Sequence, residues 1–456
     1  MMKRIQAILV VCFVLVARAN AGGLMTNTNY HIAFDRMMAR GATFDVDAAY
    51  SNPAGSVWNQ HEGWQLSLNF QKPWQNRDIE TNMPNFIGSS FSKKYEGVAK
   101  APIVPSLLAA YKKDRWAISG MLGIVGCGGY VEYSDGIPML NVPLTAMLAS
   151  SGVMPGSYTL DSEMKGKQYI YGAQVNFAYR ITDFLSAAAG LRVNYYDGYN
   201  RGHVIANNGQ LDLVNLQLDC LQKGWGISPI VSIDFHTGPV TIAARYEFRS
   251  RINTENDTKQ LNAKIFSTAI NNYVTGDMAL AQFGDKVAPY KDGVDTRYDV
   301  PAMLAVAVGY EFSDKLRATA EYHFYDDKHA KMGNNRHEEL TGGTNEFLLG
   351  AEYDINDKFT VSLGGQRTDY GQSDKFQTNT SFACDSWSIG LGGAVNLTEK
   401  IRLNAGYFIT LYSNYDKSFA AGNPAAGEGY YGTGFEAKET YSRTNNVVGV
   451  GIDFKF

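Results

Sequence analysis

The sequence predicts an all-β protein, a transmembrane β-barrel of fourteen antiparallel strands that closes on itself. Three observations support this prediction. Many segments alternate large apolar residues with small or polar ones, as strands with two different faces do. Short turns alternate with long polar connections along the chain. Beyond the first residues, no segment approaches the roughly 20 apolar residues that a membrane-spanning helix needs.

The first residues have the features of an export signal. Lys3 and Arg4 precede an apolar stretch from Ile5 to Ala17, and Ala19-Asn20-Ala21 fits a cleavage site with small residues. The apolar stretch is too short to cross roughly 30 Å of hydrocarbon. We therefore expect a signal peptide over residues 1–21, and with it an exported protein.

Composition argues against several classes of function. The net charge of the 456 residues is only −4, so no nucleic-acid partner is indicated. The mature chain has three widely spaced cysteines, which fit neither a disulfide framework nor a zinc site. We expect no metal and no cofactor. No clustered set of nucleophile, base and acid stands out either, so we expect that the protein is not an enzyme.

The alternation is clear in the segment from Tyr169 to Tyr179, where every second residue is apolar. Because alternate residues of a strand face opposite sides, such a segment has one apolar and one more polar face. The predicted strands are 64–72, 104–111, 114–124, 168–180, 184–197, 224–235, 240–252, 300–312, 316–326, 344–353, 358–367, 382–396, 401–412 and 443–456.

The connections decide between a soluble sandwich and a membrane barrel. The longest predicted loops are 125–167 and 253–299, and the short turns are Lys112-Lys113, Ile181 to Asp183, His236 to Pro239, Ser313 to Lys315, Asp354 to Asp357 and Leu397 to Lys400. Short turns at one end and long loops at the other are typical of barrels in the bacterial outer membrane. Lipid cannot satisfy open backbone groups, so the barrel must close. Phe456, which ends the last strand, is the expected signal for the barrel assembly machinery.

About forty residues precede the first strand and are expected to form a hatch, a plug inside the lumen, over residues 22–60, with the barrel over 61–456. A barrel of this width is otherwise open, which favours a plug. The alternative is a periplasmic tail. The segment contains a possible short helix from Ala33 to Arg40, followed by a turn at Asn52, Pro53, Ala54 and Gly55.

The stretch that leads into Asn52-Pro53-Ala54-Gly55 resembles the hatch of the FadL/TodX-type family, outer-membrane transporters of long-chain fatty acids and aromatic hydrocarbons. The resemblance covers almost the whole mature chain. It includes Gly224-Trp225-Gly226, Tyr246 with Arg249-Ser250, Asp299-Val300-Pro301, and the run from Leu349 to Tyr353. It implies that a hydrophobic ligand enters through the extracellular loops, passes an apolar pocket in the lumen, and leaves sideways into the outer-membrane lipid.

In that family the lateral exit lies at a kinked third strand. Here the third strand contains Gly120 and Gly123, with Gly126 beyond them. Glycines within a strand mark bulges or close approaches, so a lateral gap is expected at these positions. The alternative is that the glycines simply begin the loop after the strand.

Two further sets of residues are candidates for ligand contact. Basic side chains on the inward face of the strands could hold a carboxylate, although an ion-paired lumen is the alternative; they are Arg192, Arg245, Arg249 and Arg317. The predicted loop after the third strand is unusually apolar, which suggests ligand capture or a self-packed helix; its apolar residues include Met139, Leu140, Val142, Leu144, Met147 and Leu148.

The sequence therefore predicts passive transport of hydrophobic small molecules across the bacterial outer membrane, with a movement of the hatch and lateral release. A general aqueous porin and a surface binding or adhesion barrel are the alternatives. A porin would lack a plug, so the N-terminal segment discriminates between a transporter of hydrophobic molecules and a porin.

Overall fold

The computed structural model describes residues 30–100, 103–267, 270–281 and 288–456. The predicted signal peptide and the first residues of the predicted hatch, 22–29, lie outside these ranges.

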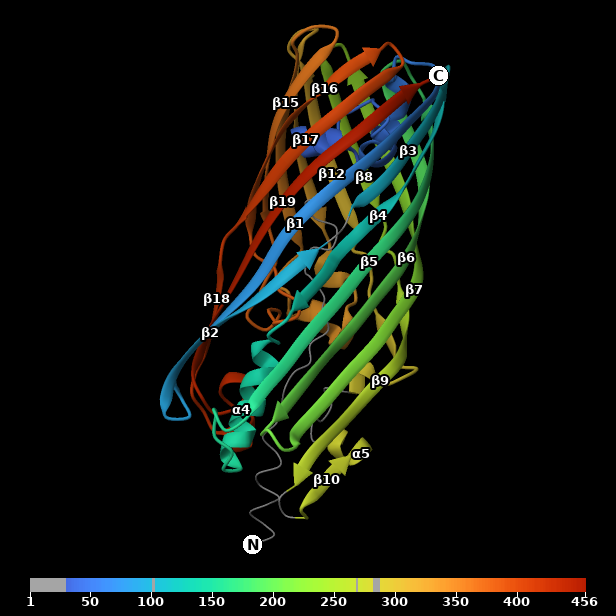
Figure 1. The fold of residues 1–456 in the computed structure, drawn as a ribbon. Helices are drawn as coiled ribbons and strands as arrows, with labels where there is room; N and C mark the ends of the chain where they lie inside the picture. The colour runs from blue at the N-terminus through green and yellow to red at the C-terminus, as the bar shows by residue number, and fades with distance from the viewer. Residues whose placement is uncertain (1–29, 101–102, 268–269, 282–287) are drawn as a thin grey trace.

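The wall of the protein is one antiparallel sheet, which closes into a barrel because β1 pairs with β19 along most of its length (Figure 1). The strands in chain order are β1 (Gly63–Phe86), β2 (Ser89–Lys100), β3 (Val104–Lys113), β4 (Trp116–Tyr133), β5 (Thr159–Arg180), β6 (Leu185–Asn207), β7 (Asp212–Thr237), β8 (Val240–Glu247), β9 (Asn253–Ser267), β10 (Asn272–Thr275), β11 (Asp295–Arg297), β12 (Met303–Glu311), β13 (Leu316–Tyr325), β14 (Thr344–Asp354), β15 (Phe359–Asp369), β16 (Ser386–Thr398), β17 (Ile401–Tyr412), β18 (Tyr415–Phe419) and β19 (Ala437–Lys455).

Several of these strands are pieces of one longer strand of the wall. β2 and β3 pair with the same edge of β1, β8 and β9 pair with the same edge of β7, and β17 and β18 pair with the same edge of β19. On the other edge of the strand that β8 and β9 form, β12 pairs with β8, and β11 and β10 pair with β9. β10, β11 and β12 therefore also form one strand of the wall. The wall is therefore a closed barrel of 14 strands, which confirms the predicted fold class.

The predicted short turns all lie at one end of the barrel, the short-turn end, together with the C-terminus (Figure 1). At the opposite end, the long-loop end, several predicted loop boundaries are wrong. Parts of 125–167 and 253–299 continue as β4, β5 and β9, most of 198–223 belongs to β6 and β7, and residues 73–100 form most of the hairpin of β1 and β2. Lipid-facing strands are recognised in a sequence by their alternating hydropathy. Beyond the apolar band this alternation is lost although the backbone pairing continues, so these parts of the strands were not predicted.

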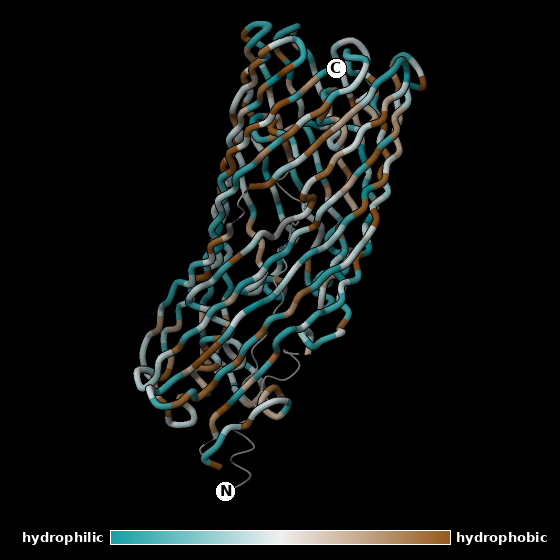
Figure 2. The backbone as a smooth tube through the Cα atoms, turned by 45° about the vertical axis from the view of Figure 1, so that its right-hand side comes forward, coloured by the Kyte–Doolittle hydropathy of each residue, from teal (hydrophilic) through white to brown (hydrophobic). Residues whose placement is uncertain are grey.

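Apolar side chains point outward over the half of the barrel near the short-turn end, and polar ones point inward. In Figure 2 hydrophobic and hydrophilic residues alternate along the strands. Exposed outward residues include Trp64, Phe70, Val175, Phe177, Leu191, Trp225, Val231, Val308, Phe347, Leu363, Leu391 and Val450. Buried inward residues include Ser67, Asn69, Ser119, Gln174, Asn176, Asn194, Ser228, Ser232, Ser362, Ser388 and Asn404. A barrel with an apolar exterior is suited to lipid.

The lumen at the short-turn end is filled by the N-terminal segment, dark blue in Figure 1. Its elements are helix α2 (Ile32–Met37), helix α3 (Ala48–Ser51) and the 3-10 helix η1 (Pro53–Trp58), and nearly all of its residues are buried. The helix predicted at Ala33 to Arg40 is thus shorter, because Met38 adopts a left-handed conformation and ends it. A plug inside the lumen is confirmed.

The remaining helical segments lie away from this plug. They are α4 (Pro138–Ser150), α5 (Gly276–Leu280), η3 (Ala288–Tyr290), η4 (Asp327–His329), η5 (Gly333–Glu339), η6 (Pro424–Ala426) and η7 (Tyr430–Gly432). α4 and α5 lie at the long-loop end (Figure 1). Within the described ranges, no helix has the length and apolar character needed to cross a membrane.

The alternation of β5 predicts how substitutions on its outward face affect assembly. Val175, which is 56% exposed, lies midway along the apolar part of this strand. Val175→Arg should cost about 2–4 kcal/mol, because it places a charge at the middle of the lipid. Heat-modifiable migration and urea titration of the refolded barrel measure the effect. Thr159→Arg, on the same strand beyond the apolar band, is the control, and an equal loss from both variants would contradict the placement of the band.

Candidate functional site

Polar side chains of the wall hold the hatch, defined here as residues 30–58, from several sides. Asn69 accepts from Ile32 N (3.1 Å), Glu321 accepts from Arg40 N and Gly41 N (2.9 and 2.8 Å), and Asn176 donates to Ala49 O (2.8 Å). Buried backbone N–H and C=O groups need hydrogen-bond partners. In the hatch, the side chains of the wall supply partners for groups that are not paired within a helix or strand. The inward polar residues of the wall therefore serve as anchors of the hatch.

Glycines in the wall make room for helix α2. A Cβ atom on Gly350 would lie 2.2 Å from the carbonyl oxygen of Met37, and one on Gly364 would lie 1.7 Å from it. Real side-chain carbons do not approach an oxygen so closely, so only glycine allows the C-terminal turn of α2 to lie against β14 and β15. The close fit explains why the predicted strands contain glycine at inward positions.

The predicted turn Asn52-Pro53-Ala54-Gly55 forms a compact latch between the hatch and the wall. The Asn52 side chain donates to Asp234 Oδ2 (2.6 Å) and accepts from Gly55 N (3.2 Å). Pro53 begins η1, where its missing N–H is not needed. Ala54 N donates to Ser232 Oγ (2.9 Å), and Ala54 O accepts from Ser186 Oγ (2.7 Å). A Cβ atom on Gly55 would lie 2.3 Å from Asn52 Nδ2, so the motif needs glycine there.

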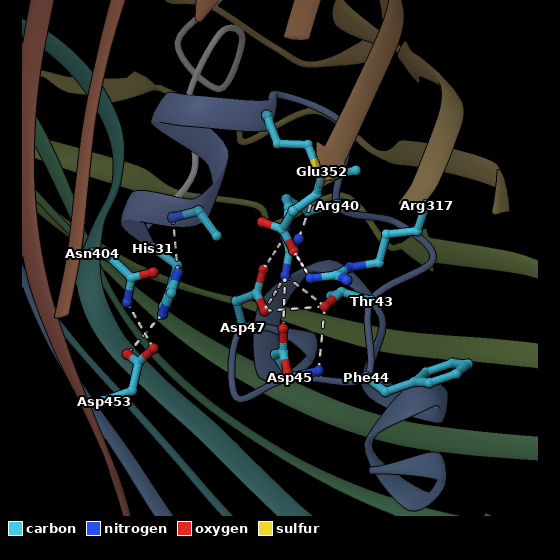
Figure 3. A network of polar contacts seen from close by, with 12 residues as sticks. His31, Arg40, Thr43, Phe44, Asp45, Asp47, Arg317, Glu352, Asn404 and Asp453 are labelled. Carbon is cyan, nitrogen blue, oxygen red and sulfur yellow. Dashed lines mark hydrogen bonds and ion pairs between the residues drawn. The ribbon is translucent and has the colours of Figure 1, made fainter. Parts of the chain in front are cut away.

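A charged network joins the hatch to the wall near the short-turn end (Figure 3). Arg36 and Arg317 both contact Glu352, and Arg317 also pairs with Asp354 (2.7 Å). Arg40 pairs within the hatch with Asp47 (2.6 Å). These buried arginines of the hatch each have a carboxylate as a partner. A buried charge without such a partner is strongly destabilising.

The hatch is also tied to the last strand of the wall. His31 Nε2 lies 3.0 Å from Asp453 Oδ1, and Asn404 donates to the other oxygen of Asp453 (2.8 Å; Figure 3). Burial lowers the pKa of His31, but the Asp453 carboxylate raises it by more, so that the His31 pKa lies above its usual value. The charged form of His31 is therefore favoured, and it holds the start of α2 against β19.

A second buried group surrounds Tyr50. Arg192 contacts Glu247, Arg245 lies 3.5 Å from the same carboxylate, and Arg245 donates to the carbonyl oxygen of Tyr50. Both guanidinium groups lie over the Tyr50 ring, at 5.9 and 4.5 Å from its centre. The structure thus brings two of the four predicted arginines together around a hatch residue.

The other two predicted arginines lie elsewhere. Arg317 is part of the network around Glu352, and Arg249 donates to His329 O nearer the long-loop end. A ligand contact by any of the four stays a prediction. Among the residues that the structure describes, no group of three His, Cys, Asp or Glu side chains is arranged for a metal ion.

The wall has an interruption between β3 and β4. Val104, Pro105 and Ser106 pair with β1, but β3 pairs with β4 only from Leu107 onward, opposite Leu122. Among the described residues, which leave out 101–102 on this side of the wall, pairing with β4 resumes at Tyr130, opposite Lys100 of β2. On its other edge, β4 has register shifts against β5 between Ile124 and Gly126 and between Cys127 and Gly129. We call this interruption the window.

Apolar side chains line the outer face of the window, and the hatch lies behind it. A cavity of about 820 Å³ opens there, lined by residues that include Leu68, Phe70, Ile103, Leu122, Tyr171, Val193 and Trp225. On the inner side, Tyr30 donates through its hydroxyl to Val125 O (3.0 Å), and Tyr30 O accepts from Ser106 Oγ. A Cβ atom on Gly123 would lie 3.5 Å from the Tyr30 ring. Tyr30 therefore closes the window from the lumen.

The three predicted glycines of the third strand do not share one role. Gly120 is paired on both edges of β4, with Ala109 and Val175, and lies outside the window. Gly123 and Gly126 lie within it. The sequence analysis missed Tyr30 and Ser106, which the tertiary structure brings together across 76 residues. The proline at 105 was a usable signal, because a residue without an N–H suits an interruption of pairing.

The predicted capture loop is helix α4, and it is folded into the mouth of the barrel. Met139, Val142 and Leu148 are buried, as are Leu140 and Leu144, whereas Met147 is partly buried. Met139 N donates to Asn379 Oδ1 (2.7 Å), which fixes the start of the helix. All of these side chains except Val142 pack with Ile79, Tyr133 and Phe382 in one apolar cluster, and Val142 belongs to a second cluster with Met83 and Phe86. Ligand capture by α4 stays a prediction.

Comparison with known proteins agrees with this architecture. Residues 261–456 match the family model of the outer membrane protein beta-barrel domain. No curated protein matches the chain in sequence.

Solved structures with the same fold cover more than nine tenths of the chain. A Pseudomonas aeruginosa FadL homologue has a TM-score of 0.63 at 12% identity, over 97% of this chain and 100% of that one. The P. putida toluene transporter TodX has a TM-score of 0.59 at 12% identity, over 91% and 95%. The Ralstonia pickettii toluene transporter TbuX has a TM-score of 0.54 at 13% identity, over 93% and 98%. The predicted resemblance is confirmed at the level of the fold, and the C-terminal part of the chain matches a β-barrel domain of outer membrane proteins.

From the contacts of the latch, we predict that a change of Asn52 loosens the hatch and leaves the barrel intact. Asn52→Ala with Pro53→Ala removes the bond to Asp234, which should weaken the docking of the hatch by about 1–3 kcal/mol. Hydrogen exchange should rise within 40–58, with unchanged heat-modifiable migration. Ser56→Ala is the matched control, since Ser56 Oγ is buried without a hydrogen-bond partner within the described structure. Unchanged exchange in the double variant would contradict the latch.

The contact between His31 and Asp453 predicts a pH dependence. Because the pKa of His31 is raised in the folded protein, its contribution to stability is complete below the pKa of an unfolded histidine, about 6.5. That contribution is lost as the pH rises through the folded pKa. The thermal midpoint of wild type minus that of His31→Gln should therefore shrink between pH 5.5 and pH 9. A difference that grows with pH would contradict the ion pair.

Proposed function

We propose that this protein is a passive transporter of hydrophobic small molecules, long-chain fatty acids or aromatic hydrocarbons, across the outer membrane. The ligand enters at the long-loop end, passes through the lumen, and leaves through the window into the lipid when the hatch moves. The observation that carries the proposal is the window between β3 and β4, with an apolar cavity outside and Tyr30 behind it.

The window is unusual for a wall in lipid. A bilayer offers no hydrogen bonds to backbone groups, so each group at membrane depth needs a partner from the protein. At the window one such partner comes from the hatch, because Tyr30 donates to Val125 O. A partner that belongs to a separate segment can be withdrawn, whereas one from a neighbouring strand cannot. This supports a gate that the hatch controls.

The chemistry of the window fits an apolar ligand. Its outer lining is mainly aliphatic and aromatic, and the side chains around it face lipid. A hydrophobic molecule that leaves through it enters the bilayer without exposure to water, and transfer of apolar surface out of water is favourable. The solved structures of the same fold support this cargo class, since they include toluene transporters and a monoaromatic hydrocarbon channel.

The packed hatch supports this function over a general porin, which needs an open aqueous path. Residues 30–58 are almost all buried, and several of them are hydrogen-bonded to the wall. Helix α4, whose apolar side chains lie at the mouth, is the proposed place of first capture. The arginines around Glu247 and Glu352 are proposed to meet a ligand only when the hatch has moved, because their present partners are carboxylates. We propose no enzymatic activity.

A disulfide across the window tests lateral release. A Cβ atom on Gly123 would lie 3.5 Å from Ser106 Cβ, which suits a disulfide. Ser106→Cys with Gly123→Cys, in a background with Cys127, Cys220 and Cys384 replaced by serine, should stop uptake of labelled oleate and toluene when oxidised. Reduction should restore uptake, because the crosslink only holds β3 against β4.

The matched control joins the same two strands outside the window. Ala110 and Ser119 face each other in the register of β3 and β4, and Ala110→Cys with Ser119→Cys should leave uptake unchanged in both redox states. Normal uptake by the oxidised window variant, with the crosslink verified by mass spectrometry, would rule out exit between β3 and β4.

A further inference from the structure

Helix α2 of the hatch carries an aspartate, Asp35, that has no ion-pair partner within the described part of the chain. We infer that the docked hatch holds a proton on Asp35 and that loss of this proton releases α2 from the wall, so that opening of the hatch responds to pH. The inference adds a control to the proposed transport. It rests on that function only for the role of hatch movement, because docking can be measured without a ligand.

The Asp35 side chain is fully buried between α2 and the wall. Gln71 Nε2 of β1 donates to Asp35 Oδ1 (3.1 Å), whereas Oδ2 has no hydrogen-bond partner among the described residues. Gln71, Gly449 and Gly406 are side by side in the register of β1, β19 and β17. A Cβ atom on Gly449 would lie 2.2 Å from Asp35 Oδ2, and one on Gly406 would lie 2.8 Å from Asp35 Cβ. The wall therefore meets the carboxyl group with backbone, and only Gln71 offers it a side-chain donor.

The other neighbours of this carboxyl group are apolar. Ile32 and Met38, on the adjacent turns of the hatch, are fully buried. Phe408 and Val447, the next inward residues of β17 and β19, form one apolar cluster with Met38. A carboxylate in such surroundings is strongly destabilised, whereas the neutral acid leaves only a hydroxyl group unpaired. Burial accordingly raises the pKa of Asp35 well above its usual value.

The cations of the hatch are engaged with other carboxylates. Each one that is close to Asp35 in sequence already has such a partner; the pairs are His31 with Asp453, Arg36 with Glu352, and Arg40 with Asp47. None of them forms an ion pair with Asp35 in the described structure, so the hatch does not neutralise this charge itself.

The strands that pack against α2 supply no counterion either. They are β1, β14, β15, β16, β17 and β19. β16 has no charged residue, and Arg367 and Asp369 of β15 pair with each other. Arg402 of β17 donates to Thr360 (3.2 Å). The other charged or titratable residues of these strands lie further along them or on the outward face; they include Lys72, Arg77, Asp78, Glu80, Glu346, Asp354, Tyr412, Lys438, Glu439, Tyr441, Arg443 and Lys455.

This burial couples docking of the hatch to a proton. A cavity of about 430 Å³ at the short-turn end is lined by Ala33 and Arg36 but not by Asp35. When α2 leaves the wall, water solvates the carboxylate, and the pKa of Asp35 returns toward about 3.9. Above that pH the released hatch binds fewer protons than the docked hatch. Docking therefore weakens as the pH rises toward the docked pKa, by up to about tenfold per pH unit.

Hydrogen exchange in residues 32–40 of the detergent-solubilised full-length protein measures opening of the hatch. The ratio of the exchange rate of wild type to that of Asp35→Asn should rise between pH 5 and pH 8, by up to about tenfold per pH unit. Asparagine keeps the shape of the acid and an acceptor for Gln71 but has no proton to lose. The intrinsic pH dependence of exchange cancels in this ratio, as does the effect of His31, which both proteins retain.

Asp45→Asn is the matched control, because Asp45 belongs to the same segment but is exposed and pairs with Arg40 (3.3 Å). This variant should keep the pH dependence of wild type. A flat ratio of wild type to Asp35→Asn would overturn the inference. Failure of Asp35→Asn to dock its hatch would also overturn it, because an amide should replace a neutral acid.

Infrared spectroscopy tests the proton without any movement of the hatch. The difference spectrum of wild type minus Asp35→Asn at pH 7 should contain the carbonyl band of a protonated carboxyl group, and its absence would contradict the inference. Uptake of labelled oleate and toluene separates the two proposals. A flat exchange ratio with normal uptake would remove the proton and leave the transport. A rising ratio without uptake of either compound would remove the transport and leave the proton.

Discussion

The need to satisfy every backbone hydrogen bond in lipid governs this structure. It forces the strands into one closed sheet, because an open edge would leave N–H and C=O groups without partners. Closure in turn gives each strand a lipid face and a lumen face, so that Val175 points outward and Asn176 inward in adjacent positions. The window is the place where this rule is met differently, since Tyr30 of the hatch supplies a bond that a neighbouring strand otherwise would.

The inward face of the wall has two electrostatic zones. Around the hatch, arginines and carboxylates are matched, and Glu247 and Glu352 each take two guanidinium groups. Toward the long-loop end, Arg77 and Arg443 face each other across a glutamine. The matched charges around Glu247 and Glu352 hold the hatch against the wall.

The hatch is docked by many modest bonds as well as by apolar packing, which places Tyr30 and Tyr50 in one buried cluster with wall residues and Phe34 in another. Its backbone is bonded to Asn69, Glu321, Asn176, Ser186 and Ser232, which come from different strands. Each such bond contributes about 0.5–1.5 kcal/mol on balance. The closure of the barrel, by contrast, rests on pairing between neighbouring strands, which these bonds to the hatch do not take part in.

Local patterns in the sequence determined the strand number, the closed barrel and the plug, because alternation, turn length and the Asn52-Pro53-Ala54-Gly55 turn are properties of neighbouring residues. The same patterns failed where neighbours carry no signal. Strands that continue beyond the lipid lose their alternation, and the apolar residues of α4 look exposed until the barrel mouth surrounds them. The arginines were recognisable as inward, but their partners were not. Whether an arginine meets Glu247, Glu352 or a second arginine depends on register and closure, which join residues as distant as Arg77 and Arg443. Only the tertiary structure decides those pairings, and with them where the pairing of β3 with β4 is interrupted.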